Sequence, residues 1–340
     1  MTEMMGLPPN LPPPLHPFAR AMCHGLWGWV TRSLHLAVKL GIADALGDEP
    51  RSATALAAAT GCDPDALERM LRLLVGCDVF ARRADGAYEH TAMSRCLRRD
   101  APLSAAASAL LQATPVYQAA LANLEHTLRT GRPSVETVAP QGFFAYLRAH
   151  PDESRIFDAA MTALTPVDAG AVAAYDFSGS GVIADIGGGQ GSFLRVILEH
   201  TPDVRTLLFD LPDVVASAPP AARLEVRPGN FFRDRLPSAD LYLLKLILHD
   251  WPDDAALRIL ANIRQAARPG AKLLVIESLL QEGPDFHPSH IMDLSMLALA
   301  SGRERSERQL GELFQASSFR HTRTIPTTSP IATIVEAVAV

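Results

Sequence analysis

Short apolar runs alternate with longer amphipathic segments from residue 182 onward, and this alternation limits the possible folds more than any other feature of the chain. The runs are VIADI, TLLFDL, LYLLKLIL and KLLVIESLL, and TIVEAVAV closes the sequence. Such alternation is typical of parallel strands joined by helices, which cover both faces of one sheet. We therefore predict an α/β domain in this part of the chain.

The first hundred residues carry a different, mainly helical pattern. Apolar residues spaced four apart predict one helix from about Ala19 to Leu46. Ser52 and Asp63 are suited to cap two shorter helices, and Gly61 is suited to end the first of them. Asp85-Gly86 then predicts a tight turn between two short strands. Three helices followed by a hairpin predict a winged-helix-like module.

Two further regions complete the predicted organisation. Residues 1–17 are rich in proline, which disfavours a helix, and are expected to form an arm. Residues 101–175 are expected to be helical, with these side chains in the interior: Phe144, Leu147, Ile156 and Met161. We place the arm and the winged-helix-like module in residues 1–105, and a helical linker with the α/β domain in residues 106–340.

The charge of the predicted module bears on DNA binding, which is a common task of winged helices. Residues 51–100 contain eight arginines and seven acidic residues, and the whole chain has a formal net charge of -6. A DNA-binding protein needs a basic surface. Arg82 and Arg83, on the predicted hairpin, keep a DNA-binding regulator open as an alternative. The balance of charge favours a structural or dimerisation module with no nucleic-acid partner.

A glycine-rich turn follows the first apolar run. Residues 185–191 are DIGGGQG, between the predicted strand VIA and the predicted helix SFLRVILEH. Glycine lets a backbone turn tightly and approach a ligand closely. Asp210 ends the next predicted strand, where a carboxylate can accept hydrogen bonds from both hydroxyls of a ribose. The two motifs together predict a site for a nucleoside-containing cofactor.

Two classes of cofactor use this arrangement. Gly187 and Gly189 fit the first two positions of the dinucleotide motif GxGxxG, but Ser192 stands at the third. Asp185, two residues before the first glycine, suits a cationic ligand better than a pyrophosphate. The residues favour S-adenosylmethionine, which carries a sulfonium and an ammonium group, over NAD. A glycine turn without a ligand is the third possibility.

A second group of polar residues surrounds His249. The run LYLLKLIL is expected to end near Leu248, which places His249 at the carboxyl edge of the sheet, where open α/β folds bind ligands. Glu277 ends the next strand at the same edge, and Glu304 follows in the segment GRERSE. Two carboxylates that reach one imidazole would orient it and stabilise its charged form.

These residues suit the removal of a proton from a hydroxyl group. A phenol has a pKa near ~10 and histidine one near ~6.5, so a positioned neutral imidazole is a fitting base at pH 7. The chain contains no GxSxG motif, which gives no support to a serine hydrolase. The alternative for His249 is a polar residue at a strand end without a chemical role.

The motifs DIGGGQGSF, LFDLPDVV, GNFF, HDWPDD, VIES and MDLSMLALASGRERSE occur in this order. Together they resemble the caffeic-acid-type plant O-methyltransferases and their bacterial relatives in antibiotic biosynthesis, from about residue 20 to the C-terminus. The resemblance implies the Rossmann-like sheet of a class I methyltransferase behind a mostly helical, winged-helix-like dimerisation domain. It also implies a homodimer that transfers methyl groups from S-adenosylmethionine to a hydroxyl of a small aromatic or polycyclic natural product.

The resemblance implies a role for each site residue. His249 is expected to be the catalytic base, flanked by Glu277 and Glu304. The cofactor site is expected to comprise Asp185, Gly187, Gly189, Asp210, Leu211, Asn230, Phe231, Lys245 and Trp251. The acceptor site is expected to comprise Phe143, Met161, Thr165, Met292 and Met296, for which packing in the core is the alternative.

Asn230 departs from the family pattern, which has aspartate at this position. Its side-chain oxygen can still accept a hydrogen bond from an adenine amine, but without the charge. Some bacterial relatives keep the fold yet catalyse decarboxylation, hydroxylation or pericyclic reactions. His249, Glu277 and Glu304 favour methyl transfer over these alternatives.

The four cysteines form no CxxC pair, and no histidine follows them at zinc-binding spacing. We expect reduced, mostly buried thiols in a cytoplasmic protein, and no metal site. The N-terminus lacks the basic and apolar regions of a signal peptide. Lys245 interrupts the best apolar run, so no contact with a membrane is expected.

Overall fold

The computed structural model describes residues 17–329 and 331–340 of the chain. They form two compact units, one made of residues up to Gln118 with His150–Ala163, the other of Ala119–Ala149 with Leu164–Val340. The expected arm lies outside the described residues except for Pro17, which begins the first helix. The expected boundary between residues 105 and 106 falls within the first unit and stays a prediction.

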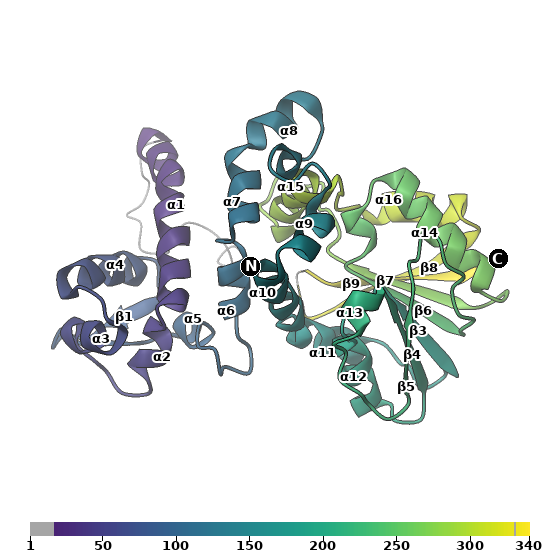
Figure 1. Cartoon of the computed structure of the whole chain (residues 1–340), viewed down its shortest axis with the longest axis horizontal. Helices are drawn as coiled ribbons and strands as arrows, with labels where there is room; N and C mark the ends of the chain where they lie inside the picture. Colours follow the sequence, from purple (N-terminus) through teal and green to yellow (C-terminus); the bar gives the residue numbers. More distant parts are fainter. Residues whose placement is uncertain (1–16, 330) are drawn as a thin grey trace. The chain divides into compact units, whose positions relative to one another are not determined.

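The first unit is mostly helical and carries one short hairpin (Figure 1). Its elements are α1 (Pro17–Lys39), α2 (Ile42–Leu46), α3 (Ala53–Thr60), α4 (Pro64–Gly76), β1 (Phe80–Arg82), β2 (Tyr88–His90), α5 (Ala92–Arg95), α6 (Ala106–Leu111) and α10 (Pro151–Thr162). The predicted caps are confirmed, since Ser52 accepts from the N–H of Ala55 and Asp63 from that of Ala66. The single helix predicted up to Leu46 is wrong, because Gly41 adopts a left-handed conformation that separates α1 from α2.

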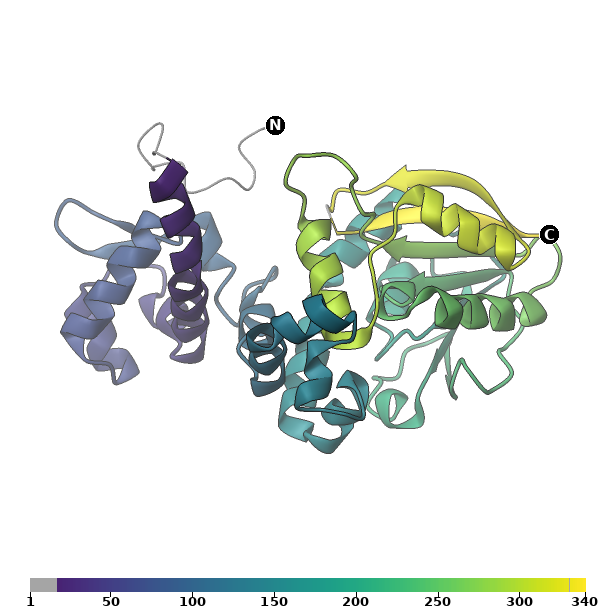
Figure 2. The same cartoon turned by 90° about the horizontal axis from the view of Figure 1, so that it is seen from above.

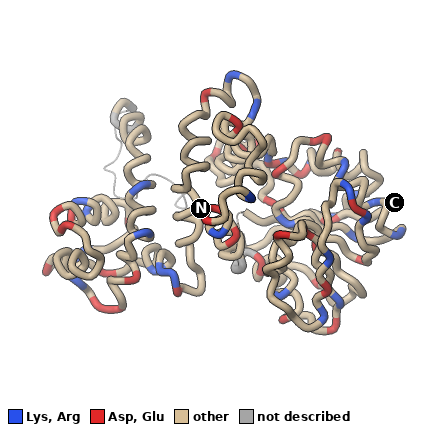
Figure 3. The backbone as a smooth tube through the Cα atoms, in the orientation of Figure 1, with Lys and Arg blue, Asp and Glu red and all other residues tan. Residues whose placement is uncertain are grey.

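The hairpin forms around Asp85-Gly86 as predicted, with β1 and β2 antiparallel. Its two arginines lie in ion pairs, Arg82 with Glu68 at 3.1 Å and Arg83 with Asp85 at 3.3 Å. Figure 3 shows basic and acidic residues interspersed along this unit. The basic side chains of the hairpin are thus matched by acidic neighbours.

The second unit is built on a seven-stranded sheet in the order β5-β4-β3-β6-β7-β9-β8. Its strands are β3 (Val182–Ile186), β4 (Arg205–Asp210), β5 (Leu224–Pro228), β6 (Leu241–Lys245), β7 (Lys272–Glu277), β8 (Phe319–Pro326) and β9 (Thr333–Ala339). The first five in this order run parallel, and β9 and β8 join antiparallel at one edge. The predicted parallel strands and the C-terminal strand are confirmed.

Helices cover both faces of this sheet (Figure 2). One face packs against α11 (Thr165–Ala174), α12 (Ser192–His200) and α13 (Pro212–Val215). The other packs against α14 (Asp253–Ala266) and α16 (Glu307–Ala316). The remaining helical elements are α7 (Pro115–Ala122), α8 (Leu124–Thr130), η1 (Ser134–Thr137), α9 (Phe143–Ala149), η2 (Leu248–Asp250) and α15 (Pro288–Ala300).

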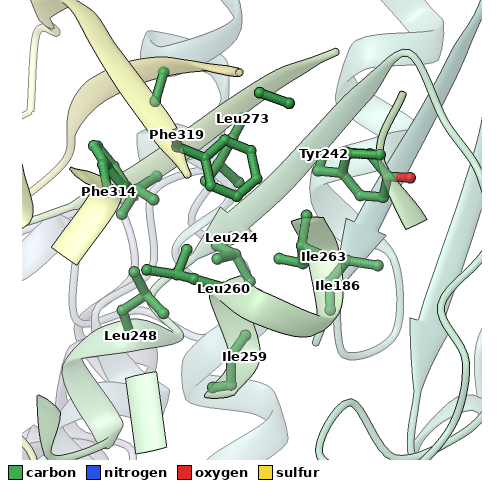
Figure 4. Close-up of a cluster of buried hydrophobic side chains, with 14 of the residues drawn as sticks. Ile186, Tyr242, Leu244, Leu248, Ile259, Leu260, Ile263, Leu273, Phe314 and Phe319 are labelled. Atoms are coloured by element: carbon green, nitrogen blue, oxygen red, sulfur yellow. The ribbon is translucent and has the colours of Figure 1, made fainter. Parts of the chain in front are cut away.

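The larger core lies between the sheet and helices α14 and α16 (Figure 4). Leu244 of β6 and Leu273 of β7 are fully buried there with Ile263 of α14 and Phe314 of α16. Because successive residues of a strand face opposite sides, Leu243 belongs to the core of the other face. Burial on both faces explains why these strands are continuous apolar runs.

The chain leaves β6 earlier than predicted. The strand ends at Lys245 rather than near Leu248, because Leu246 adopts a left-handed φ of 55° and the chain turns into η2. Helix α14 then begins at Asp253, directly after Pro252. His249 therefore lies in a turn beyond the strand, still at the carboxyl edge of the sheet.

All four cysteines are free and half-buried, rather than mostly buried as expected. Two of them, Cys77 and Cys96, stand at helix C-caps, which lie near the surface. None of the helices in residues 17–329 and 331–340 has the length and apolar character needed to cross a membrane. Within the same residues, no three histidine, cysteine or acidic side chains are gathered as metal ligands would be.

Candidate active site

The glycine-rich turn joins β3 to α12 and is tightly packed on one side. A Cβ at residue 187 would lie 2.6 Å from Cδ1 of Ile247, and one at residue 188 would lie 2.4 Å from Oδ2 of Asp185. Gly189 has a positive φ of 59°, and a Cβ there would meet nothing within 4 Å. The turn therefore needs glycine for close packing below, while its Gly189 side faces open space.

Asp210, at the end of β4, is held beside this turn. Its Oδ2 accepts from the N–H of Gly189 at 2.8 Å, and its Oδ1 accepts from the N–H of Leu211 at 2.6 Å. Both oxygens of the carboxylate are therefore held in place by backbone donors. This fixed acceptor suits the hydroxyl groups of a ribose.

A cluster of buried charges lies under the turn. Asp168 of α11 is fully buried, and its Oδ1 lies 2.8 Å from Nζ of Lys245. Asp185 is also buried, and its Oδ2 finds no hydrogen-bond partner among the described residues. Burial raises the pKa of Asp185 to about 7, although Lys245 opposes the rise. A buried acid with a free oxygen fits a cationic ligand, which would supply the missing partner.

Trp251 is surrounded by phenylalanine rings. Its ring centroid lies 6.1 Å from that of Phe144, nearly parallel to it, and 6.1 Å and 4.7 Å from those of Phe231 and Phe232, nearly perpendicular to them. The neighbouring Phe143, which we predicted for the acceptor site, is buried and contacts Phe144. The sequence alone could not distinguish these two adjacent rings. Phe144 thus joins the residues of this edge.

Asn230 stabilises the turn that leads to these rings. Its Oδ1 accepts from the N–H of Phe232 at 2.9 Å, and its own N–H donates to Oδ2 of Asp234 at 2.7 Å. The side-chain oxygen is thus already bonded to the backbone. The side-chain NH2 group and a second lone pair stay open to a ligand.

His249 is buried and bonded through one ring nitrogen. Its Nδ1 lies 2.8 Å from Oε1 of Glu304, and because an ionised carboxylate only accepts, Nδ1 carries the proton. In the neutral ring, Nε2 is then the unprotonated nitrogen. Nε2 lies 3.6 Å from Oδ1 of Asp250, a residue for which we predicted no role.

Glu277 contacts His249 differently from Glu304. Its Oε1 accepts from the backbone N–H of His249 at 3.1 Å, so it holds the turn and not the ring. We expected both carboxylates to reach the imidazole. Glu304 forms a hydrogen bond with the ring, whereas Glu277 bonds the backbone. The second oxygen of each glutamate is buried and finds no partner among the described residues.

The charges of His249 and its acidic neighbours shift one another's pKa values. Burial by itself lowers the pKa of His249, but Asp250, Glu304 and Glu277 outweigh it and raise the pKa to about 9. Burial raises the pKa of Glu277 to about 7 and that of Asp250 to about 6, although His249 opposes both. With a pKa of about 9, the imidazole is mostly protonated at pH 7 and is stabilised by the carboxylates around it.

Of the five residues predicted for the acceptor site, four belong to the second unit and Met161 belongs to the first. Met292 and Met296 lie one turn apart on α15 and are half-buried. Met161 belongs to α10 of the first unit and is exposed, contrary to the expected burial. Thr165 begins α11, but its side chain lies outside the described residues.

Comparison with known proteins is consistent over both units. The model of an O-methyltransferase domain matches residues 121–320, and that of an O-methyltransferase dimerisation domain matches residues 23–100. The mitomycin biosynthesis 6-O-methyltransferase of Streptomyces lavendulae is 38% identical over 317 residues, which cover 91% of this chain and 90% of the relative. The 8-amino-8-demethylriboflavin N,N-dimethyltransferase of Streptomyces davaonensis is 35% identical, with 84% and 85% covered.

Solved structures agree with this assignment. CalO1, a methyltransferase in calicheamicin biosynthesis crystallised with S-adenosylhomocysteine, superimposes with a TM-score of 0.86 at 34% identity, over 95% of this chain and 98% of that one. The mostly helical first unit, the Rossmann-like second unit and the matched families point to the same conclusion. This chain belongs to the S-adenosylmethionine-dependent O-methyltransferases that carry an N-terminal dimerisation domain.

Proposed function

We propose that this enzyme methylates a hydroxyl group on a small aromatic or polycyclic natural product, with His249 as the general base. The observation that carries the proposal is the bond between Nδ1 of His249 and Glu304, at 2.8 Å in a buried setting. In the neutral form of the ring, this bond commits Nδ1 to a carboxylate and leaves Nε2 as the nitrogen that can accept a proton.

The chain's own residues divide the task. S-adenosylmethionine, when bound, supplies an electrophilic methyl group. The residues proposed to hold it are Asp185, Gly187, Gly189, Asp210, Leu211, Asn230, Phe231, Lys245 and Trp251. Nε2 of His249 takes the proton of the acceptor hydroxyl, and Glu304 balances the positive charge that develops on the ring. Alignment of the two reactants contributes much of the rate in such a displacement.

The class of acceptor is supported by two lines of argument. Relatives act in the biosynthesis of the natural products mitomycin and calicheamicin. In this chain, the half-buried Met292 and Met296 and the ring of Phe144 offer apolar surface of the kind that binds flat molecules. We keep Phe143, Met161 and Thr165 as proposed acceptor contacts.

A methyl-transfer assay tests the proposal. Purified protein is incubated with S-adenosylmethionine carrying a labelled methyl group and with hydroxylated aromatic compounds, and products are identified by mass spectrometry. Matched amines test methylation of nitrogen, which the riboflavin-analogue relative makes the second candidate. Label on oxygen that falls sharply in His249→Ala is the expected result. Transfer to amines alone, or no transfer to any acceptor, would contradict it.

The enzyme is also proposed to form a homodimer through its first unit. Helix α1 exposes four large apolar side chains along one face: Phe18, Met22, Leu26 and Trp29, exposed by 68%, 54%, 55% and 71%. Their spacing of four, four and three residues aligns them on the helix. Exposed apolar stripes of this kind typically mark protein contacts, and the dimerisation family model begins at residue 23.

A further inference from the structure

Arg305 is the largest of the fully buried side chains in the described part of the protein, although it carries a charge. It follows Glu304 directly, in the loop that joins α15 to α16. Arginine is rarely buried unless its donors are bonded. The proposed chemistry assigns no task to this residue, so its partners call for an explanation.

The guanidinium of Arg305 binds the turn that carries His249 on both sides of that residue. Nη1 donates to the carbonyl oxygen of Leu248 at 2.7 Å, and Nη2 donates to that of Trp251 at 2.7 Å. Nε and Nη2 also donate to Oδ1 of Asp253, at 3.0 and 2.8 Å. One planar group thus bonds the carbonyl oxygens of Leu248 and Trp251, on either side of His249, and the side chain of Asp253 at the start of α14.

The backbone that precedes Arg305 packs against the same turn. The N–H of Arg303 donates to the carbonyl oxygen of His249 at 2.8 Å. A Cβ at Gly302 would lie 1.9 Å from that same oxygen, so the backbones of the two segments are in direct contact. The carbonyl oxygen of Arg305 accepts from the N–H of Leu280, in the loop that follows Glu277. Segment 302–305, which includes Glu304, therefore contacts both the turn that carries His249 and the loop that directly follows Glu277.

We propose that Arg305 is a positioning residue for methyl transfer, because its guanidinium fixes the carbonyls of Leu248 and Trp251 and thereby sets the direction of the His249 imidazole. The inference rests on the proposed role of His249 as base. The turn has few bonds of its own, from the N–H of Trp251 to Leu248 and from that of Asp250 to Ile247. A shift of about 1 Å in a reacting group can lower a rate by ~10²-fold.

The geometry requires arginine rather than any cation. The guanidinium is a rigid fork with five N–H donors, and here it reaches two carbonyls and a carboxylate at once. The ammonium of lysine is a single point on a flexible stem. Lysine would keep the charge beside the acidic groups around the turn, which are Asp250, Asp253, Glu277 and Glu304, but not the three directions of donation.

The test compares Arg305→Met and Arg305→Lys with the wild-type enzyme. In both variants we expect kcat to fall about 10- to 100-fold, less in the lysine variant, with KM for the acceptor within about threefold. In Arg305→Lys, which keeps the positive charge, the pH inflection of kcat should move to lower pH, because a ring that loses its bond to Glu304 loses an influence that raises its pKa. The Nδ1 proton of His249, followed by NMR on protein with labelled histidine, should broaden or shift.

Arg303→Gln is the matched control. Its guanidinium lies 3.7 Å from the other oxygen of Asp253 and is half-exposed, so the variant loses a charge at the same aspartate but keeps the bonds to the turn. It should keep kcat within about twofold, the pH inflection and the NMR signal. If Arg305→Met does not fold, the comparison of Arg305→Lys with the wild-type enzyme is the test.

Three outcomes would overturn the proposal. The first is a kcat within twofold of wild type in both Arg305 variants. The second is a fall in kcat with an unmoved inflection and an unchanged Nδ1 signal, since the ring would then be held without Arg305. The third is an equal effect of Arg303→Gln. If His249→Ala keeps full turnover, the base role fails, and the NMR signal still decides whether Arg305 orients the ring.

Discussion

Nδ1 of His249 lies 2.8 Å from Oε1 of Glu304, although the two residues are 55 positions apart in the sequence. Both side chains are buried, so the bond is shielded from water. The N–H of Glu304 donates in turn to Oδ1 of Asp293 at 2.9 Å, on the helix that also carries Met292 and Met296. The orientation of the base is thereby linked to the helix proposed to contact the acceptor.

Removal of the imidazole tests this arrangement directly. His249→Ala should lower kcat by roughly 10² to 10⁴, the usual contribution of a general base. Glu304→Gln should cost less, because glutamine keeps a hydrogen-bond acceptor but loses the charge that stabilises the imidazolium. Both effects are measured as turnover at saturating cofactor. Binding of S-adenosylhomocysteine, measured by calorimetry, should change little in either variant, and a parallel loss of binding would contradict a purely catalytic role.

The rate should depend on pH in a direction fixed by the raised pKa of His249. The base must be neutral, and with a pKa of about 9 only roughly 1% of the ring is neutral at pH 7. The kcat should therefore rise about tenfold per pH unit from pH 7 and level off near pH 9. In Glu304→Gln the pKa falls, because one of the influences that raise it is lost, so the inflection should move to lower pH. A pH profile that is flat between 6 and 9 would contradict the proposal.

The strands were predictable where both of their faces are buried. β3, β4, β6, β7 and β9 are apolar runs, because helices cover the sheet on either side. β5 and β8 escaped prediction, since they are edge strands whose side chains are largely exposed and polar. The glycine turn and Asp210 were predictable as a pair because each directly follows a strand.

The atomic contacts of the site were less predictable. The sequence indicated that His249, Glu277 and Glu304 meet, but not that Glu277 bonds the backbone while Glu304 bonds the ring. The sequence did not indicate that Arg305 and Asp168 are buried, because a charged residue in a helix or loop is usually exposed. Their burial is decided by partners far away in the chain, for which no local pattern exists. Asp250 stands next to His249 and could have been noticed by that position alone.

The carboxylate of Asp210 should be needed for binding of the cofactor. Asp210→Ala removes two hydrogen bonds to the backbone, from the N–H groups of Gly189 and Leu211, and the proposed acceptor for ribose hydroxyls. The affinity for S-adenosylhomocysteine, measured by calorimetry, should fall at least tenfold. Asp213→Asn, an exposed acidic residue of α13, is the matched control and should keep wild-type affinity. Equal affinities of Asp210→Ala and wild type would refute the assignment.

The exposed stripe on α1 should hold two copies of the chain together. Leu26→Asp places a charge between Met22 and Trp29 on the apolar face, where burial against a partner would be costly. Light scattering should show a dimer for the wild type and a lower mass for this variant at micromolar concentration. Thr31→Asp is the control, because at about 100° per residue Thr31 lies on the opposite side of the helix. If both variants stay dimeric, the stripe is not the interface, and if both dissociate, the effect reflects charge on the helix rather than loss of its apolar face.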